Sequence, residues 1–393
     1  MTLGLQQKKF LYRFDKRYFH TGKLKNHTLL RYLIKEMLLY FGIAFLFFFA
    51  VFFVNQILLL AESILKKHVP IWDVVRLITY CLPFIIAQSA PFATLVGFLM
   101  CIGGMMSANE ILIVRASGFG YRIILIPVVV LGLAISVFSF FVNDYLLPLG
   151  TIHYNKLYKS ILMSNPAVEL EPHSIKRMND STLVIGDVSG NTVSDLVFFD
   201  TDPDGNQRII SAGSSDVQKS DDAGVIMRLD MKDAIVAFFK QGKKDTFDAV
   251  HSDAVQLNIF ESSFFDNAGG VSPREMTSYD LLKKLKEMRK QADIKQKTLN
   301  MYSLEYNKKF SLPFGSLFFA VLAMPLAILF GKHNGQTIGL IIGLFISVLY
   351  WAMMILGQIF SGKSGQGGMI SMWLPNLVTG IAGFIFYLTL VKR

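Results

Sequence analysis

Long unbroken runs of apolar residues dominate this chain, and short polar or basic stretches separate them. An α-helix rises about 1.5 Å per residue, so roughly 20 uncharged apolar residues cross the hydrocarbon layer of a bilayer. Six runs are long enough, which predicts six membrane-spanning helices. Their expected bounds are 37–61, 77–109, 123–143, 310–331, 334–362 and 364–391.

The second run is longer than one upright helix needs, and Pro83 and Pro91 are expected to mark an entry segment or a kink. Pro-Phe-Ala-Thr-Leu at 91–95 resembles Pro-Phe-Gly-Ser-Leu at 313–317, near the start of the fourth run. This echo permits a three-plus-three arrangement of the spans, although so short a pattern also recurs by chance in an apolar sequence.

A different pattern fills the region between the third and fourth runs. Short alternating stretches at 182–185, 196–199, 208–210, 225–229 and 234–238 are separated by turn sequences. Strands repeated every ten or so residues predict a β-sandwich or open barrel. Residues 278–296 then predict a basic amphipathic helix that is capped by Thr277 or Ser278. Its expected apolar face contains Leu281, Leu282, Leu285 and Met288.

Composition and charge support a membrane protein with a soluble part. Hydrophobic residues make up 52% of the 393 residues and charged residues only 17%, against about a quarter charged in a soluble domain. Residues 1–37 carry nine Lys or Arg against two acidic residues, so the positive-inside rule places this end in the cytoplasm. The insert, by contrast, is acidic. On this orientation Lys66, Lys67 and Arg76 lie outside, against the rule, and are candidate ligand contacts.

Motifs for catalysis are missing from the sequence. It has no phosphate-binding loop, no zinc-protease motif and no nucleophile elbow. Cys81 and Cys101 both lie in apolar runs, so they form no metal-binding pair. The histidines of the insert are expected to be ordinary surface residues. Asp144, at the end of the third span, is expected to mark the water interface, and the alternative is an intramembrane acid. A chain of this kind is passive or is driven by a partner.

One short connection could receive a partner. Residues 107–118 begin with capping residues, continue through apolar 111–114 and stop at Gly118, which predicts a short helix across the membrane face. It is either a solvated connector with a Glu110–Arg115 charge pair or a coupling helix that docks into a separate ATPase. The residues alone leave both readings open, because either lipid or a partner could cover the apolar side chains.

Several segments resemble one family. Asn-Glu-Ile-x-x-x-Arg-Ala-Ser-Gly at 109–118, the stretches 30–36 and 305–313, and the order three spans, insert, three spans resemble lipopolysaccharide export permeases of the LptF/LptG type. Residues 324–326 and 372–373 lean toward the LptF member. The basic leader 1–28 departs from the short start that is usual in the family.

The resemblance implies an α-helical membrane protein of six transmembrane helices with an inserted periplasmic all-β jelly-roll domain. The expected parts are a cytoplasmic basic segment 1–36, spans one to three at 37–148 with a coupling helix at 107–119, the jelly roll at 149–272, an amphipathic connecting helix at 273–304, and spans four to six at 305–393.

The implied function is that of a non-catalytic permease subunit of an ABC-type exporter in the bacterial inner membrane. It would extract lipopolysaccharide and pass it to periplasmic bridge proteins of jelly-roll fold. The implied partners are a homologous six-span permease in a heterodimer, a cytoplasmic ATPase dimer that uses ATP, and lipopolysaccharide. No cofactor, metal or nucleic acid is expected on this chain.

The resemblance also implies three groups of site residues. The ATPase-coupling residues would be Asn109, Glu110, Ile111, Val114, Arg115, Ala116 and Gly118. The contacts to lipid phosphates would be Lys66, Lys67, Lys308 and Lys309, whose alternative role is to anchor the chain by snorkelling to lipid headgroups. The lateral gate would contain Gly339 and Gly343 of the fifth span, facing the first span of the partner permease.

Two rival functions remain. A membrane-anchored periplasmic adhesion or sensor protein would need only one or two spans, whereas glycines at close-packing spacings in six spans favour transport. An exporter subunit of the mechanotransmission type carries its outer domain after the first span, whereas the insert here follows the third.

Overall fold

The computed structural model describes residues 26–64, 70–164, 170–178, 181–201, 206–220, 222, 224–239, 247–260, 271–290, 296–364 and 368–392, and the statements below concern these residues. The chain divides into two compact units, each described by itself. One is a helical unit from the parts up to residue 58, 81–150 and 276–393, and the other contains 59–80 and 151–275 with the whole β-sheet.

Six helical segments of the described chain are long and apolar enough to cross a membrane, which confirms the predicted number of spans. They are α2 (Asn26–Ile64), α3 (Ile71–Ser107), α5 (Arg122–Phe141) with its continuation, α9 (Gln296–Phe330), α10 (Gly335–Ser364) and α11 (Gly368–Lys392). The third helix continues through a π-helical turn η2 (Val142–Leu146) into α6 (Leu147–Ser164), and α9 begins 14 residues before the predicted start at 310. Only the apolar part of a helix must match the bilayer, so polar ends extend it beyond the expected bounds.

The second and fourth spans form the centre of the helical unit. In α3 and α9, 83% and 72% of the most apolar stretch is buried, against 17% in α2 and 28% in α10 and α11. The two echoing segments meet there, because a Cβ added at Gly315 of α9 would lie 3.6 Å from Cβ of Pro91 in α3. The outer helices keep broad apolar faces exposed, as a bilayer or a partner helix requires.

Both echoing segments begin with a proline inside a helix. Proline has no N–H, so the carbonyl four residues earlier loses its helical partner, and no water is present in hydrocarbon to replace it. In α3, Pro91 leaves the carbonyl of Ala87 without that partner. The hydroxyl of Ser139, on the third span, donates to this carbonyl at 3.4 Å.

The fourth span repeats this solution. Pro313 leaves the carbonyl of Lys309 without its helical partner, and the side-chain amide of Asn143 donates to it at 3.1 Å. Ser139 and Asn143 are four residues apart, so both come from one face of the third span. In both helices a side chain of the third span donates to the carbonyl that the proline leaves without a helical donor. This common feature extends the similarity between the two halves that the sequence suggested.

Glycines bring α10 against α3. A Cβ at Gly339 would lie 2.7 Å from the carbonyl oxygen of Leu99, and one at Gly343 would lie 2.8 Å from Cγ2 of Val96. Gly335 continues the line against Gly103. The predicted gate glycines therefore pack against the second span of their own chain, and a contact with a partner would have to use another face of α10.

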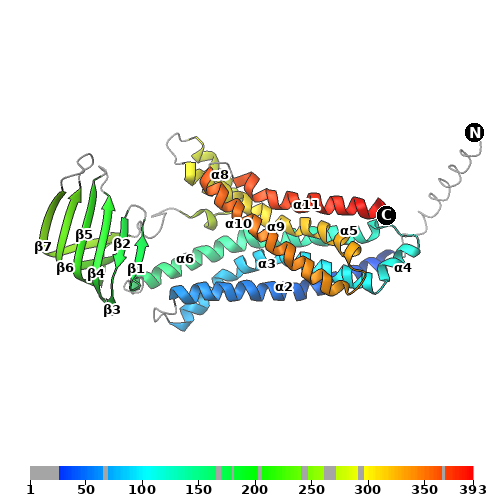
Figure 1. Cartoon of the computed structure of the whole chain (residues 1–393), viewed down its shortest axis with the longest axis horizontal. Helices are drawn as coiled ribbons and strands as arrows, with labels where there is room; N and C mark the ends of the chain where they lie inside the picture. The colour runs from blue at the N-terminus through cyan, green and yellow to red at the C-terminus, as the bar shows by residue number, and fades with distance from the viewer. Residues whose placement is uncertain are drawn as a thin grey trace, which may run out of the picture. The chain divides into compact units, whose positions relative to one another are not determined.

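The insert forms one antiparallel sheet, which confirms the inserted β domain (Figure 1). Its strands are β1 (Ser174–Arg177), β2 (Ser181–Ile185), β3 (Val188–Ser189), β4 (Thr192–Thr201), β5 (Gln207–Lys219), β6 (Val225–Phe239) and β7 (Phe247–Phe260). The order is β1-β2-β4-β5-β6-β7, with β3 pairing to β4. Apart from the short β3, which lies between β2 and β4 along the chain, neighbouring strands follow one another in sequence order, as in a meander. The jelly-roll topology stays an expectation from the family.

A bend line crosses the middle of the sheet. Asp195 in β4 and Asp233 in β6 adopt left-handed backbone angles, with φ of 52° and 54°, and Gly213 lies between them in register. In β4, two consecutive side chains face outward here, so that Val193 before the bend and Leu196 after it are both fully buried. The inward–outward alternation of side chains along β4 therefore shifts by one residue at the bend, and the apolar face of the sheet stays continuous.

This slip changes which residues face the core. Leu183, Phe198, Ile210 and Val236 lie opposite one another on four neighbouring strands and are all buried. The alternating stretches 196–199 and 234–238 predict inward positions at Val197 and Val236. For Val197 this prediction is wrong, because the left-handed Asp195 reverses the phase and Leu196 and Phe198 are buried instead. Val236 is buried, as predicted.

The connecting helix α8 (Ser278–Met288) follows a short 3₁₀ turn, η4 (Pro273–Glu275). Thr277 is its N-cap, since its hydroxyl accepts from the N–H of Asp280 at 3.2 Å. The buried side chains of α8 pack with Tyr302 of α9 in one cluster; they are Leu281, Leu285 and Met288. Leu282, expected on the same face, is 37% exposed.

The close contacts of Gly335, Gly339 and Gly343 with α3, called the glycine line below, predict the effect of adding one methyl group. Gly339→Ala should lower the free energy of unfolding by about 1–3 kcal/mol, because the added Cβ meets backbone that cannot move aside easily. Gly42→Ala in α2 is the matched control, because nothing lies within 4 Å of its added Cβ. Unfolding followed in detergent micelles measures both. Equal stability of the two variants would contradict the packing described.

Candidate functional site

The short helix α4 (Glu110–Ala116) follows directly from the buried helix α3. Asn109 makes the turn between them with a left-handed φ of 62°, and its side chain forms no cap hydrogen bond. Asparagine adopts this conformation more readily than most residues, because its short polar side chain tolerates it. Asn109 thus contributes a backbone turn where the sequence had predicted a side-chain cap.

The end of α4 agrees with the sequence prediction. Gly118 has a φ of +86°, and its N–H donates to the carbonyl of Arg115 at 2.9 Å. The N–H of Phe119 reaches the carbonyl of Val114 at 3.4 Å. These two bonds form a Schellman motif, which requires the left-handed conformation that glycine adopts without strain.

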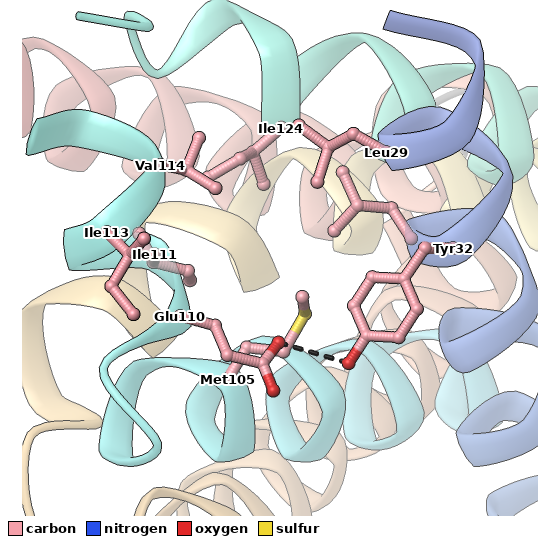
Figure 2. Close-up of a pocket in the computed structure, with 9 residues that line it drawn as sticks. Leu29, Tyr32, Met105, Glu110, Ile111, Ile113, Val114 and Ile124 are labelled. Atoms are coloured by element: carbon pink, nitrogen blue, oxygen red, sulfur yellow. Dashed lines mark hydrogen bonds between the residues drawn. The ribbon is translucent and has the colours of Figure 1, made fainter. Parts of the chain in front are cut away.

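One side chain anchors α4 to the bundle. Ile111 is 2% exposed and belongs to the main apolar cluster of the helices. Beside it lies a cavity of about 220 Å³ between α4, the first turns of α2 and the start of α5 (Figure 2). The residues that line it are Leu29, Tyr32, Leu33, Met105, Glu110, Ile111, Ile113, Val114 and Ile124.

The two charges of α4 bind separate aromatic residues. The hydroxyl of Tyr32 in α2 donates to Oε2 of Glu110 at 3.1 Å, and Figure 2 shows the two side chains pointing toward one another. The guanidinium of Arg115 hydrogen-bonds the hydroxyl of Tyr121, and its Cζ lies 4.1 Å from the ring centroid. Both charges therefore hold α4 in place, and these contacts replace the predicted pairing of Glu110 with Arg115.

The outer face of α4 is apolar. Leu112 is 47% exposed and Ile113 is 63% exposed, and Ala116 is exposed beside them. An apolar group in water raises the free energy by roughly 25 cal/mol per Å². The described chain does not cover this face, so lipid or another protein must do so.

The predicted lipid contacts divide into three cases. Lys66 and Lys67 lie outside the described residues. Lys308 is partly exposed, and its Nζ lies 3.5 Å from Oε1 of Glu305. Lys309 is 3% exposed, so a lipid phosphate reaches its ammonium only after the surrounding structure opens.

The surroundings of Lys309 form a polar junction of Asn143, Asp144, Ser278 and Lys309, which the sequence reasoning missed. Nζ of Lys309 donates to the carbonyl of Asn143 at 3.2 Å and lies 3.7 Å from Oδ1 of Asp144. The N–H and the hydroxyl of Ser278 donate to the same carboxylate at 2.6 and 3.0 Å. Two sequence signals could have revealed it. Lys309 lies four residues before Pro313, and Asn143 and Asp144 lie shortly before Pro148.

Comparison with known protein families shows a match over most of the chain. Residues 31–389 match the profile of the family described as "Lipopolysaccharide export system permease LptF/LptG". The match includes most or all of each of the six spans. Among curated proteins, no match was found.

The anchoring of α4 predicts different roles for two neighbouring isoleucines. Ile111→Ala should loosen α4, because removing a buried isoleucine side chain costs about 2–5 kcal/mol, and amide hydrogen exchange over 110–116 should accelerate at least about tenfold. Ile113→Ala is the matched control and should leave exchange unchanged, since its side chain is largely exposed. Equal acceleration in both variants would contradict the assignment of Ile111 as the anchor.

Proposed function

Because this chain belongs to the LptF/LptG family of lipopolysaccharide export permeases, we propose that it is the transmembrane permease subunit of an ABC-type exporter. In this role it extracts lipopolysaccharide from the bacterial inner membrane and passes it to a periplasmic bridge. The observation that carries the proposal is α4, a short helix with an uncovered apolar face, fixed to the end of the most buried span. Family members are permease subunits, and the energy comes from a separate ATPase dimer.

The ATPase docks on the outer face of α4. The excess of basic residues before the first span supports a cytoplasmic location for this end of the bundle, where a soluble ATPase would be available. Leu112 and Ile113 supply the apolar contact, and Ile111 on the opposite side holds the helix to the bundle. A helix clamped on one face and free on the other can receive a partner without losing its own position.

A displacement of α4 reaches the whole bundle through α3. Only residues 108 and 109 separate the two helices. Further along, α3 packs closely on α10 through Gly103 and on α9 through Pro91. Close backbone contacts transmit movement with little loss, because packed interiors have low compressibility. ATP-driven movement at α4 thus changes the spacing of α3, α9 and α10.

The lipid path uses the outer end of the bundle and the insert. Lys308, Lys66 and Lys67 are the candidate contacts for lipid phosphates at the outer rim, and a homologous six-span permease completes the cavity. The partner's first span meets the exposed face of α10, opposite the glycine line. The insert offers an apolar face for acyl chains, and its edge strand β7 pairs with the next bridge protein by strand addition.

Substitution on the outer face of α4 tests the coupling. Ile113→Asp should abolish co-purification of the ATPase, because an unpaired charge in the centre of an interface typically costs several kcal/mol, while unfolding of the permease in micelles stays unchanged. Tyr279→Asp in α8 is a control with similar exposure, 76% against 63%. Retention of the ATPase by the Ile113 variant, with full nucleotide turnover, would exclude α4 as the docking site.

Photo-crosslinking tests the role of the insert. A crosslinker at Phe198 or Val236, on the buried face, should capture lipopolysaccharide during export, whereas one at Ile235 should not, because it lies on the other face and is 53% exposed. Mass analysis of the adducts identifies the captured molecule. Lipid adducts at Ile235 alone, or only protein adducts at all three positions, would favour the adhesion or sensor function.

A further inference from the structure

The π-helical turn on the third span leaves one carbonyl available. The N–H of Leu147 bonds the carbonyl of Val142, five residues back, and not that of Asn143. The next bond of this register would come from Pro148, which has no N–H. The carbonyl of Asn143 is thus without a helical donor, and the ammonium of Lys309 donates to it at 3.2 Å. Asn143 in turn donates to the carbonyl of Lys309 at 3.1 Å, so the two residues bind reciprocally.

The neighbouring carboxylate connects this pair to α8. Asp144 accepts from the N–H of Ser278 at 2.6 Å and from its hydroxyl at 3.0 Å. Ser278 is the first residue of α8, whose initial N–H groups have no partner within the helix. A carboxylate at this end also interacts favourably with the helix dipole. Asp144 therefore acts as a second cap, supplied from the third span.

Lys309 and Asp144 depend on each other. The lysine side chain is 3% exposed, the aspartate side chain is 21% exposed, and 3.7 Å separates Nζ from Oδ1. Removing one member of a buried ion pair leaves an uncompensated charge, which destabilises far more than removing both members. Loss of either charge should therefore disturb the junction, and loss of both should disturb it less.

We propose that the polar junction is a latch that holds α8 to the third and fourth spans, and that Lys309 supports export through Asp144 without touching lipid. Lys309 and Asp144 are then positioning residues. Five exposed cations lie on α8 and on the two residues that follow it; they are Lys283, Lys284 and Lys286 of the helix, then Arg289 and Lys290. The closed latch fixes the position of these exposed cations, which can interact with anionic headgroups. Lys309 itself is buried and does not reach the headgroups.

The experiment uses the full permease complex in proteoliposomes that contain lipopolysaccharide. Amide exchange over 278–288 reports the latch, and release of lipopolysaccharide to a soluble acceptor reports export. The variants are Lys309→Met, Asp144→Asn, the double variant, Lys309→Arg and the neighbouring control Lys308→Met. Only variants that purify as intact complexes are compared.

The latch predicts that Lys309→Met and Asp144→Asn each accelerate exchange in α8 about tenfold or more and reduce export. In both assays, the double variant should be impaired no more than the more impaired of the two single variants. Lys309→Arg should keep the parent's α8 exchange rate and its export. Lys308→Met should leave α8 exchange unchanged. Direct lipid contact predicts instead unchanged exchange in the Lys309 variant and multiplied export losses in the double variant, a result that would overturn the proposal.

The export measurement rests on the proposed function, whereas the exchange measurement does not. If none of the complexes, including the parent, releases lipopolysaccharide, the proposed function fails and the exchange data still decide whether the latch exists. Failure of the latch alone would appear as normal α8 protection in Lys309→Met with export reduced.

Discussion

The bundle depends on the rule that backbone polar groups in hydrocarbon must find partners within the protein. Two central helices break their own hydrogen-bond ladders at Pro91 and Pro313. The third span carries Ser139 and Asn143 at a spacing that places both on one face, and each binds one of the carbonyls that the prolines leave without a helical donor. The third span thereby fixes where α3 and α9 lie against it, which makes it a template for the middle of the bundle.

The same rule explains why a charged lysine lies inside. Once Asn143 bonds the carbonyl of Lys309, the two residues are already adjacent, and the π-helical turn offers the ammonium a carbonyl in return. Asp144 then balances the charge and caps α8. Its Oδ1 faces the ammonium and accepts from the N–H of Ser278, and its Oδ2 accepts from the hydroxyl of Ser278. Each bond in this series satisfies a group that the preceding break in helical geometry left without a partner.

Local features of the sequence predicted much of this structure. Run length gave the number of spans, Gly118 gave the end of α4, and apolar spacing gave the face of α8 through Leu281 and Leu285. What it missed depends on distant residues. The partners of Lys309 are Asn143 and Asp144, which lie 166 and 165 positions away along the chain. The reversed phase at Val197 comes from a bend at which Asp195 of β4 and Asp233 of β6 both adopt left-handed backbone angles. Periodicity within one segment contains no information about either.

The glycine line also determines which surfaces are left for other molecules. Because Gly339 and Gly343 hold α10 to α3, and a buried bond from Tyr350 to Asn376 at 2.8 Å ties α10 to α11, these helices cannot turn their exposed faces inward without breaking packed contacts. The apolar side chains that remain outside, Ile341 and Phe345 of α10 among them, are therefore a permanent surface. Under the proposed function, acyl chains and the helices of a second permease would both use this surface, so assembly and lipid entry would compete for the same apolar area.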